Sequence, residues 1–473
     1  MRRFLLLLLV LLLTACVPMG NTAVQTLGPT STPVPSPTPA KQFELNIHPD
    51  GPLYVGDQVS FEVITPSGFD PGGKQVEVSL DDQLIGKADF SPYGIAGRQQ
   101  ATFWWVWDTS VLQEGIYVLD FSVTPNGPSW QQSVYLQPHS ALPAAEQDAR
   151  WESYVTDCCT IYYISGTAAA RDIQELATEA EASVKQLSSL TTGDDQENIP
   201  VVLIPRTLGH GGFTNGPIYV SYLDRNYAGS TFGMVFQHEA AHWFDRQLGG
   251  DLRPTIFLEG LAVYMAGGHF KPEALISRAA ALLPLNWYIP LRQLADSFYP
   301  SQHEIGYLEA GALVQYLVDS FGWEAFNSFY RDIHPVPSGL QSDAIDTALQ
   351  KHFGMTFDQL EEDFLDYLRA QPMDLINIED LRLTVQFYNT VRRYQQMFDP
   401  SAYFETAWLA DAMVMRQRNI TADYLRKPDG ILNQYLEELL VQADSSLRSG
   451  DYPGTEQKIK AINVMLDILD DAK

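Results

Sequence analysis

The 473-residue chain contains few cysteines and few basic residues, and each shortage excludes a class of protein. Three cysteines are too few for a disulfide scaffold, so buried cores must hold the fold together. The 30 lysines and arginines stand against 58 aspartates and glutamates, which gives a formal net charge of −28. So acidic a chain is a poor partner for nucleic acid or for anionic lipid headgroups, and the simplest role of its charge is solubility.

Two of the cysteines, Cys158 and Cys159, are adjacent in the segment CCTIYYIS. A disulfide between neighbouring residues closes a small, strained ring and joins no distant parts of a fold. We interpret the pair as two free thiols on a strand. A redox-active bond between them and a second metal site are the alternatives.

An apolar run over residues 4–13 is too short to span a bilayer and is typical of a secretory signal. It ends in LTAC, which resembles the lipobox of bacterial lipoproteins. The resemblance implies a signal peptide over residues 1–15 and membrane attachment through a lipidated Cys16, outside the cytoplasm. An ordinary secretory signal with an incidental cysteine is the alternative.

Residues 16–42 are predicted to be a tether. They contain GPTSTPVPSPTPA, in which proline recurs at short intervals among serine and threonine. This composition favours an extended polyproline conformation and cannot build a core. A lipid anchor, a stiff polar spacer and then folded domains are the layout of a surface-displayed protein.

Residues 43–138 are predicted to form an all-β sandwich. Short runs rich in β-branched and aromatic residues are bounded by turn residues, namely VSFEVITPSG, QVEVSLDDQLIG, ATFWWVWDT and GIYVLDFSVTP. The Asp81-Asp82 step between two of these runs indicates a hairpin. The stretch WDTSVLQEGIYVLDFSV resembles the end of bacterial Ig-like modules. The region gathers no acids or histidines, so a spacer or binding module is expected.

Two further regions follow, which makes the chain multidomain. Over residues 146–370, strands such as TIYYIS, IPVVLIPR and GPIYVSYL come first and helices follow, which indicates an α+β domain. Residues 371–473 show helical patterns alone and are predicted to form a small all-α bundle. Its helices are expected at residues 376–397, 401–418, 431–447 and 455–469.

The stretch FQHEAAHWFD carries two histidines four positions apart, His238 and His242. The helix expected around them can be capped by Ser230 or Thr231 and ends at Gly249-Gly250. Residues at i and i+4 share a helix face, so both imidazoles can bind one metal ion. Glu239 lies one step round the helix, where it can hold the attacking water and take its proton.

A catalytic zinc site needs three protein ligands, and Glu259 is the best third candidate. It is an isolated acid in the apolar stretch TIFLEGLAVYMA, on a second helix that opens after Pro254. A carboxylate in such surroundings needs a cation or several hydrogen bonds. The alternative is a helix-start residue that faces solvent. Asp245, on the same helix as the histidines, is placed to hydrogen-bond an imidazole rather than to bind metal.

The pair of motifs HEAAH and FLEGLAVY resembles the gluzincin metallopeptidases, especially the peptidase MA-like branch, over about residues 159–370. The resemblance implies a zincin-like fold and one zinc ion per chain, bound by His238, His242 and Glu259, with Glu239 as the base. The gap between the motifs is slightly shorter than in the aminopeptidase relatives, so the resemblance does not carry over their specificity.

The family also uses a tyrosine or histidine to stabilise the oxyanion, and SQHEIGYLEAGALVQYLVDSFG resembles the segment that carries it. Tyr307 is the candidate, with His303 behind it; a core aromatic on an amphipathic helix is the alternative. The strand GPIYVSY is expected to offer an edge to an extended peptide. His210, in the glycine-rich GHGGF, is grouped with the histidines expected at the surface or in cores, and a position at the border of the cleft is its alternative. The remaining histidines are expected at the surface or in cores: His48, His139, His269, His334 and His352.

The sequence thus predicts a lipid-anchored, extracytoplasmic zinc metallopeptidase that acts on a peptide or protein substrate, and it leaves the oligomeric state open. The competing hypothesis is a catalytically silent surface binding or scaffold protein that keeps the same fold. A metallohydrolase of non-peptide amides would use the same residues. Because a scaffold has no need of Glu239, the enzyme is favoured.

Overall fold

The computed structural model describes residues 43–188, 198–229, 231–248 and 250–471. The predicted signal peptide, the lipidated Cys16 and the tether lie outside these residues, as do Ser230 and Gly249. Within the described ranges, no helix has both the length and the apolar character needed to cross a membrane.

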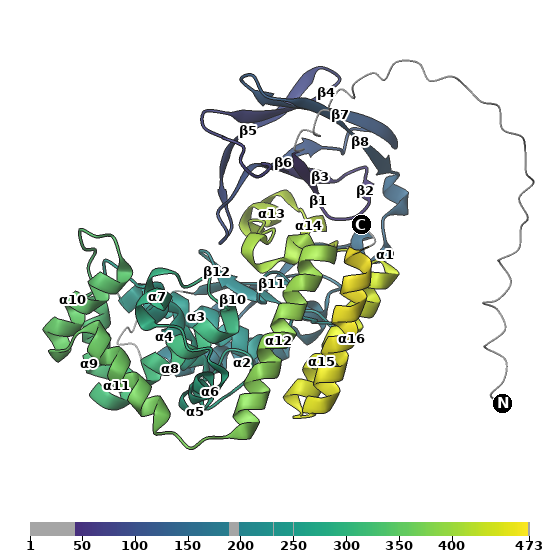
Figure 1. Ribbon diagram of the computed structural model, residues 1–473. Helices are drawn as coiled ribbons and strands as arrows, with labels where there is room; N and C mark the ends of the chain where they lie inside the picture. The colour runs from purple at the N-terminus through teal and green to yellow at the C-terminus, as the bar shows by residue number, and fades with distance from the viewer. Residues whose placement is uncertain (1–42, 189–197, 230, 249, 472–473) are drawn as a thin grey trace, which may run out of the picture. The chain divides into compact units, whose positions relative to one another are not determined.

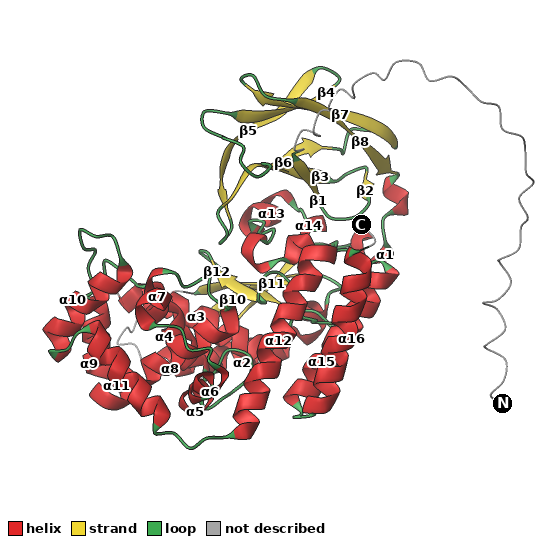
Figure 2. Cartoon of the chain, viewed as in Figure 1, coloured by secondary structure: helices red, strands yellow, loops and turns green. Residues whose placement is uncertain are grey.

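Residues 43–137, called the β-module here, form an eight-stranded sheet in the order β1-β3-β6-β5-β4-β7-β8-β2 (Figures 1 and 2). The strands are β1 (Glu44–His48), β2 (Leu53–Tyr54), β3 (Gln58–Ile64), β4 (Gln75–Leu80), β5 (Gln83–Tyr93), β6 (Arg98–Asp108), β7 (Gly115–Thr124) and β8 (Ser129–Gln137). The first part of β5 pairs with β4 and its last residues pair with β6. One strand therefore joins the two halves of the sheet around a shared core.

The alternation of side chains explains this core. Val59, Phe61 and Val63 of β3 pack with Leu119 and Phe121 of β7 in one buried cluster. The predicted hairpin turn is confirmed, because Asp81 and Asp82 both have positive φ angles, of 50° and 61°, as a two-residue hairpin requires. The all-β prediction holds, while the Ig-like resemblance stays a prediction.

A second sheet has the order β12-β13-β11-β10-β9. Its strands are β9 (Trp151–Val155), β10 (Cys159–Ile164), β11 (Ile199–Ile204), β12 (Gly212–Thr214) and β13 (Ile218–Ser221). β10, β11 and β13 are parallel, and β9 and β12 run antiparallel at the two edges. The residues of β11, IPVVLI, are all apolar because both faces of this sheet are covered.

One face of this sheet packs on helices α2 (Ala168–Ser188) and α3 (Phe232–Leu248), through residues such as Val201 and Val220. The opposite face, with Val202 and Tyr219, packs on Trp408 and Tyr424 from near the C-terminus and on Trp105 of the β-module. Val201 and Val202, which are adjacent in β11, are therefore both buried, but against different parts of the chain.

The cysteine pair differs from its prediction. Cys158 and Cys159 are joined by a disulfide, so the interpretation as free thiols is wrong. Successive side chains of a regular strand point to opposite faces. Here a bend at Asp157 and Cys158 precedes β10, which releases the first cysteine from that alternation.

After the sheet the chain is helical, and α4 (Thr255–Ala266) packs between α3 and α8 (His303–Phe321). This packing brings α3 and α4, which are consecutive, together with α8, which follows three further helices along the chain. The other helices of this part are α5 (Leu275–Ala280), α6 (Leu282–Leu285), α7 (Leu291–Asp296), α9 (Trp323–Arg331), α10 (Gln341–Phe353) and α11 (Phe357–Arg369).

Three long helices near the C-terminus pack together: α12 (Leu375–Phe398), α15 (Ile431–Arg448) and α16 (Tyr452–Asp470) (Figure 1). The helix predicted over residues 401–418 is wrong in its first half. That stretch forms two 3-10 turns, Pro400–Ala402 and Phe404–Thr406, before α13 (Ala412–Arg418), and α14 (Ala422–Leu425) follows. Trp408 is buried against the sheet, and this tertiary contact overrides the helical pattern.

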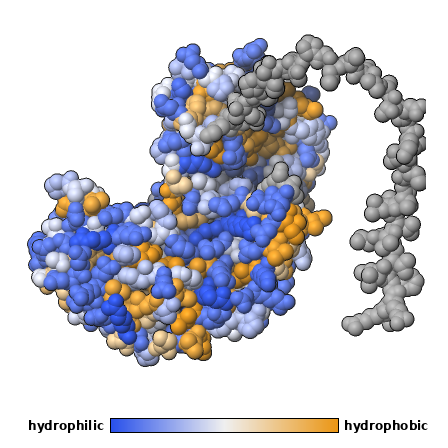
Figure 3. All heavy atoms as spheres, viewed as in Figure 1, coloured by the Kyte–Doolittle hydropathy of each residue, from blue (hydrophilic) through white to orange (hydrophobic). Residues whose placement is uncertain are grey.

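Contacts group the described residues from Phe43 onward as one compact unit. The domain boundaries at residues 138, 146 and 370 stay predictions. On the face drawn in Figure 3, hydrophilic residues predominate and apolar residues lie between them, in keeping with the net charge of −28.

Candidate active site

The motif helix forms as predicted. α3 begins directly after Thr231 and ends at Leu248, and Gly250 follows with a φ of 113°, a value that glycine alone adopts readily. His238 and His242 lie on one face, and their rings are 4.9 Å apart at an angle of 84°. Two imidazoles at right angles can direct ring nitrogens to one point.

Glu259 of α4 completes the group. Its Oε2 lies 3.4 Å from His238 Nε2 and 3.3 Å from His242 Nε2. Four ligands around a tetrahedral zinc ion, each about 2.0–2.2 Å from the metal, stand about 3.3–3.5 Å from one another. The two distances to Glu259 match that spacing, and all three donor atoms lie within 4.8 Å of one another, so the group could hold a metal ion such as zinc.

Electrostatics support the same grouping. Glu259 is 5% exposed, and burial alone would raise the pKa of its carboxyl. The two imidazoles outweigh that effect and hold the pKa well below its usual value. A buried carboxylate that stays ionised between two imidazoles is a cation-binding arrangement, and the burial of Glu259 excludes the alternative of a solvent-facing residue.

Glu239 lies beside the histidines, and together with them and Glu259 it lines one cavity. Thr214 of β12 donates a hydrogen bond from Oγ1 to Glu239 Oε2 over 2.8 Å. Burial raises the pKa of the Glu239 carboxyl to about 7. A carboxyl with that pKa can both accept and release a proton near neutral pH.

A close approach of β12 to α3 makes this contact possible. A Cβ atom on Gly212 would lie 2.3 Å from Val235 Cγ1 and 3.1 Å from Glu239 Cγ. Only glycine therefore allows β12 to lie against the motif helix, and this places Thr214 beside Glu239.

Two tyrosines face the ligand glutamate. Tyr307, on the first turns of α8, is buried and lines the cavity, with its ring 6.0 Å from that of His238. Tyr299 donates a hydrogen bond from its hydroxyl to Glu259 Oε1 over 2.7 Å. Tyr299 could not be predicted from sequence, because it precedes α8 in the irregular segment SFYPS, where no periodicity marks it.

Among the described residues, the hydrogen bonds of Asp245 go to Tyr330 and Arg253 and not to an imidazole. Asp245 is 1% exposed, and its Oδ2 lies 3.3 Å from the Tyr330 hydroxyl and 3.4 Å from Arg253 Nη1. Its role is therefore to join α3 to α9 and to the segment before α4. Helical spacing alone could not distinguish this role from support of His242.

The prediction that GPIYVSY offers a sheet edge is wrong. β13 lies between β11 and β12, so both its sides are paired, and β12 is the edge strand. β12 has only three residues and follows a glycine-rich loop, so it carries too little pattern to be recognised in sequence. All three residues of β12 line the cavity.

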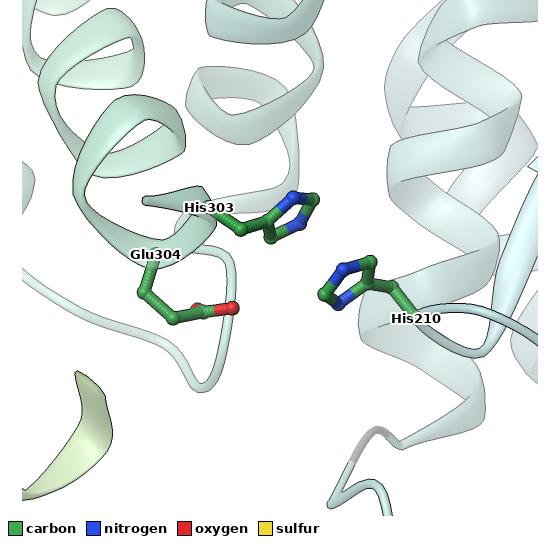
Figure 4. A group of neighbouring side chains, drawn as sticks. All are labelled: His210, His303 and Glu304. Carbon is green, nitrogen blue, oxygen red and sulfur yellow. The ribbon is translucent and has the colours of Figure 1, made fainter. Parts of the chain in front are cut away.

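A second histidine-rich group lies in the same cavity. His210, His303 and Glu304 each offer a ligand atom, and these atoms lie within 4.8 Å of one another. The two imidazole rings lie face to face, 3.5 Å apart and tilted by only 2° (Figure 4). Lone pairs in two parallel ring planes do not converge on one ion.

A cation already stands beside this second group. Arg392 Nη2 lies 3.5 Å from His210 Nε2 and 3.7 Å from Glu304 Oε1. Ring geometry and this guanidinium together exclude the group as a metal site. His210 and His269 both line the cavity, so their assignment to surface or core positions is wrong, and the alternative that His210 borders the cleft holds. His269 also hydrogen-bonds Glu304 over 3.0 Å.

One cavity of about 560 Å³ connects these features. It is lined by both motif histidines, Glu239, Glu259, the two tyrosines, β12 and an apolar set: Ile95, Leu208, Phe213, Phe404, Ala407 and Leu409. The metal-ligand group therefore opens onto a space in which a substrate can lie beside the predicted base.

Comparisons with known proteins do not identify the function, so its assignment rests on the residues of the site. No protein-family model matches the chain, and no curated protein matches it. Among solved structures, it is similar to an aminopeptidase N family protein from Idiomarina loihiensis, with 10% identity, a TM-score of 0.31, and coverage of 71% of this chain and 78% of that chain. So loose a superposition carries no inference about fold or activity.

Proposed function

We propose that the chain is a zinc-dependent metallopeptidase of the gluzincin type. The observation that carries this proposal is the position of Glu259 Oε2, 3.3–3.4 Å from the Nε2 atoms of His238 and His242, with Glu239 lining the same cavity. A cavity and an edge strand next to the same group suit a peptide substrate.

The residues divide the chemistry among them. A bound zinc ion supplies the positive charge that makes a water molecule nucleophilic and polarises the scissile carbonyl. Glu239 accepts the proton of that water and passes it to the leaving amine, while Thr214 holds the carboxylate in place. Tyr307 donates a hydrogen bond to the oxyanion. β12 binds the substrate backbone through its open edge.

The same proposal includes the location of the enzyme. The lipobox-like LTAC and the proline-rich residues 16–42 support a lipoprotein held at the outer side of a bacterial membrane through Cys16. Hydrolysis of peptides outside the cell fits this placement. The scaffold hypothesis is weaker, because Thr214 positions the Glu239 carboxylate in a way that metal binding alone does not require.

Metal content and peptide cleavage test the proposal together. The purified full chain should hold one zinc ion, measured by elemental mass spectrometry, and should cleave a mixture of short peptides. His238→Ala and Glu259→Ala should each lose the zinc and the cleavage, because each removes one of three ligands. His139→Ala is the matched control, since this exposed histidine of the segment after β8 lies away from the cavity.

The outcomes separate the hypotheses. A wild-type chain without stoichiometric zinc would refute the metal site. Zinc that stays bound while no peptide is cleaved would favour the scaffold protein. A chelator that abolishes cleavage, with recovery upon added zinc, would support the enzyme.

The two tyrosines should have different roles. Tyr299→Phe removes the hydrogen bond to Glu259 Oε1 and should weaken zinc binding about 10–100-fold, measured by competition with a fluorescent chelator. Tyr307→Phe should lower kcat about 10²-fold, because it removes the proposed oxyanion donor, and this loss should exceed its effect on zinc affinity, although Tyr307 also interacts with Glu259. The opposite pattern would exchange the two assignments.

A further inference from the structure

The cavity extends from the metal-ligand group to an apolar wall that three parts of the chain build. Ile95 comes from the turn between β5 and β6 of the β-module. Phe213 comes from β12, and Phe404 and Leu409 come from the segment before α13. Residues far apart in sequence thus contribute apolar side chains to one lining.

Hydrogen bonds fasten the turn of the β-module to residues 404–409. Ala96 N–H donates to Glu405 O over 3.3 Å, and the Tyr93 hydroxyl donates to Ala407 O over 2.9 Å. The Leu409 N–H in turn donates to the Tyr93 hydroxyl over 3.3 Å. The position of Ile95 is therefore set by contacts outside the β-module.

Backbone packing makes this junction tight. Gly94 has a φ of 67°, and a Cβ atom there would lie 2.2 Å from Glu405 O. Only glycine lets the turn approach the segment so closely. The turn is thus shaped for this contact and is not a free hairpin end.

The wall continues toward the catalytic centre. Phe404 lies 4.1 Å from the His210 ring and 4.6 Å from the His303 ring, and His303 is 4.0 Å from Tyr307. Tyr307 in turn faces Glu259. The wall and the candidate metal site therefore line one cavity, so a peptide bound at the site can also contact the wall.

The wall also has apolar surface without a partner in the described chain. Ile95 is 43% exposed and Leu409 is 39% exposed, although both line the cavity. Exposed apolar groups that line a cavity gain stability when an apolar ligand covers them. The charged Arg246, Asp251 and Arg253 line the same cavity, so its lining is not uniformly apolar.

We infer that this wall, made of Ile95, Phe213, Phe404 and Leu409, is a substrate subsite for a bulky apolar side chain of the peptide. The β-module is then part of the specificity site and is not a spacer. This inference rests on the proposed peptidase function for the identity of the ligand as a peptide. It adds the side-chain class that the enzyme prefers and the residues that select it.

The test compares two peptides that differ only by leucine or serine at the position where a randomised peptide mixture shows its strongest preference. The wild type should prefer leucine in kcat/KM, and Ile95→Asp should reduce that preference about tenfold or more, because a charge replaces apolar contact. Ile95→Ala should give a smaller reduction. Ile116→Asp is the matched control, since this isoleucine is 72% exposed on β7 and lies outside the cavity.

Binding keeps the test independent of catalysis. The same peptide pair is titrated against the Glu239→Gln chain and against Glu239→Gln with Ile95→Asp, by fluorescence anisotropy. A leucine preference in binding that Ile95→Asp removes supports the subsite, whether or not the wild type cleaves peptides. Absence of cleavage by the wild type would refute the proposed function and not the subsite. A mixture without an apolar preference, or a preference that both Ile95 variants leave unchanged, would overturn the subsite.

Discussion

Glu239→Gln should abolish peptide cleavage while zinc stays bound. The substitution keeps the size of the side chain and an oxygen that can accept the hydrogen bond from Thr214, but the amide cannot take a proton from water. General-base catalysis contributes about 10²–10⁴-fold, so kcat/KM on a fluorogenic peptide should fall by at least that factor. The metal donors belong to other residues, so zinc content should stay at one per chain.

The matched control for this experiment is Glu438→Gln. Glu438 is an exposed glutamate of α15 and takes no part in the cavity. The control substitution likewise replaces a glutamate carboxyl with an amide, so any general effect of losing a carboxyl group appears in both variants. If Glu239→Gln kept activity within a few-fold of the wild type, another group would have to be the base.

The candidate metal-binding group could be predicted from sequence because the placement of its residues is local. The four-residue spacing of His238 and His242 determines a shared helix face whatever the rest of the chain does. Glu259 could be predicted because an acid in an apolar helix needs a cation. Both signals lie within one or two helices, where pattern and packing agree.

Thr214 and Tyr299 could not be predicted in the same way. Each reaches the site from an irregular or very short segment, and each acts through a contact between elements. Their positions follow from how β12 and the chain before α8 pack on α3 and α4. Tertiary packing of this kind leaves no periodic trace in sequence.

The organisation of the chain shows the same limit. Residues 400–426 form only short helices and 3-10 turns, and their Trp408 and Tyr424 cover one face of the second sheet. The apolar run IPVVLI of β11 indicates that both faces of the strand are covered, but it does not identify the covering segments. The partner becomes visible only in the folded chain.

A buried arginine, Arg206, connects β11 to the β-module and to the end of α12. Its substitution is the second change for which we expect a large effect. Arg206 follows β11 and is 1% exposed. Its Nη1 lies 2.9 Å from Asp50 Oδ2 of the β-module, and its Nη2 lies 3.1 Å from Asp399 Oδ1 at the end of α12. Nη2 also donates to Ser401 Oγ over 2.6 Å. One cation thus neutralises carboxylates from two distant segments.

Arg206→Met should therefore destabilise the protein strongly. Methionine keeps much of the apolar length but leaves Asp50 and Asp399 without their cation, and breaking a buried pair by removal of one partner costs about 3–5 kcal/mol. The loss is measured as a lower urea midpoint, followed by both circular dichroism and tryptophan fluorescence. Arg171→Met, which removes an exposed arginine paired with Asp224, should move the midpoint far less.

A second substitution identifies the cause of that loss. If the uncompensated charge destabilises Arg206→Met, then Asp399→Asn should be less harmful in the Arg206→Met background than in the wild type, because it removes one unpaired carboxylate. Equal effects in both backgrounds would mean that lost packing, and not charge, explains the result. Since Asp399 and Ser401 directly precede Phe404 of the apolar wall, the charge mechanism also predicts that Arg206→Met weakens the leucine preference of the subsite.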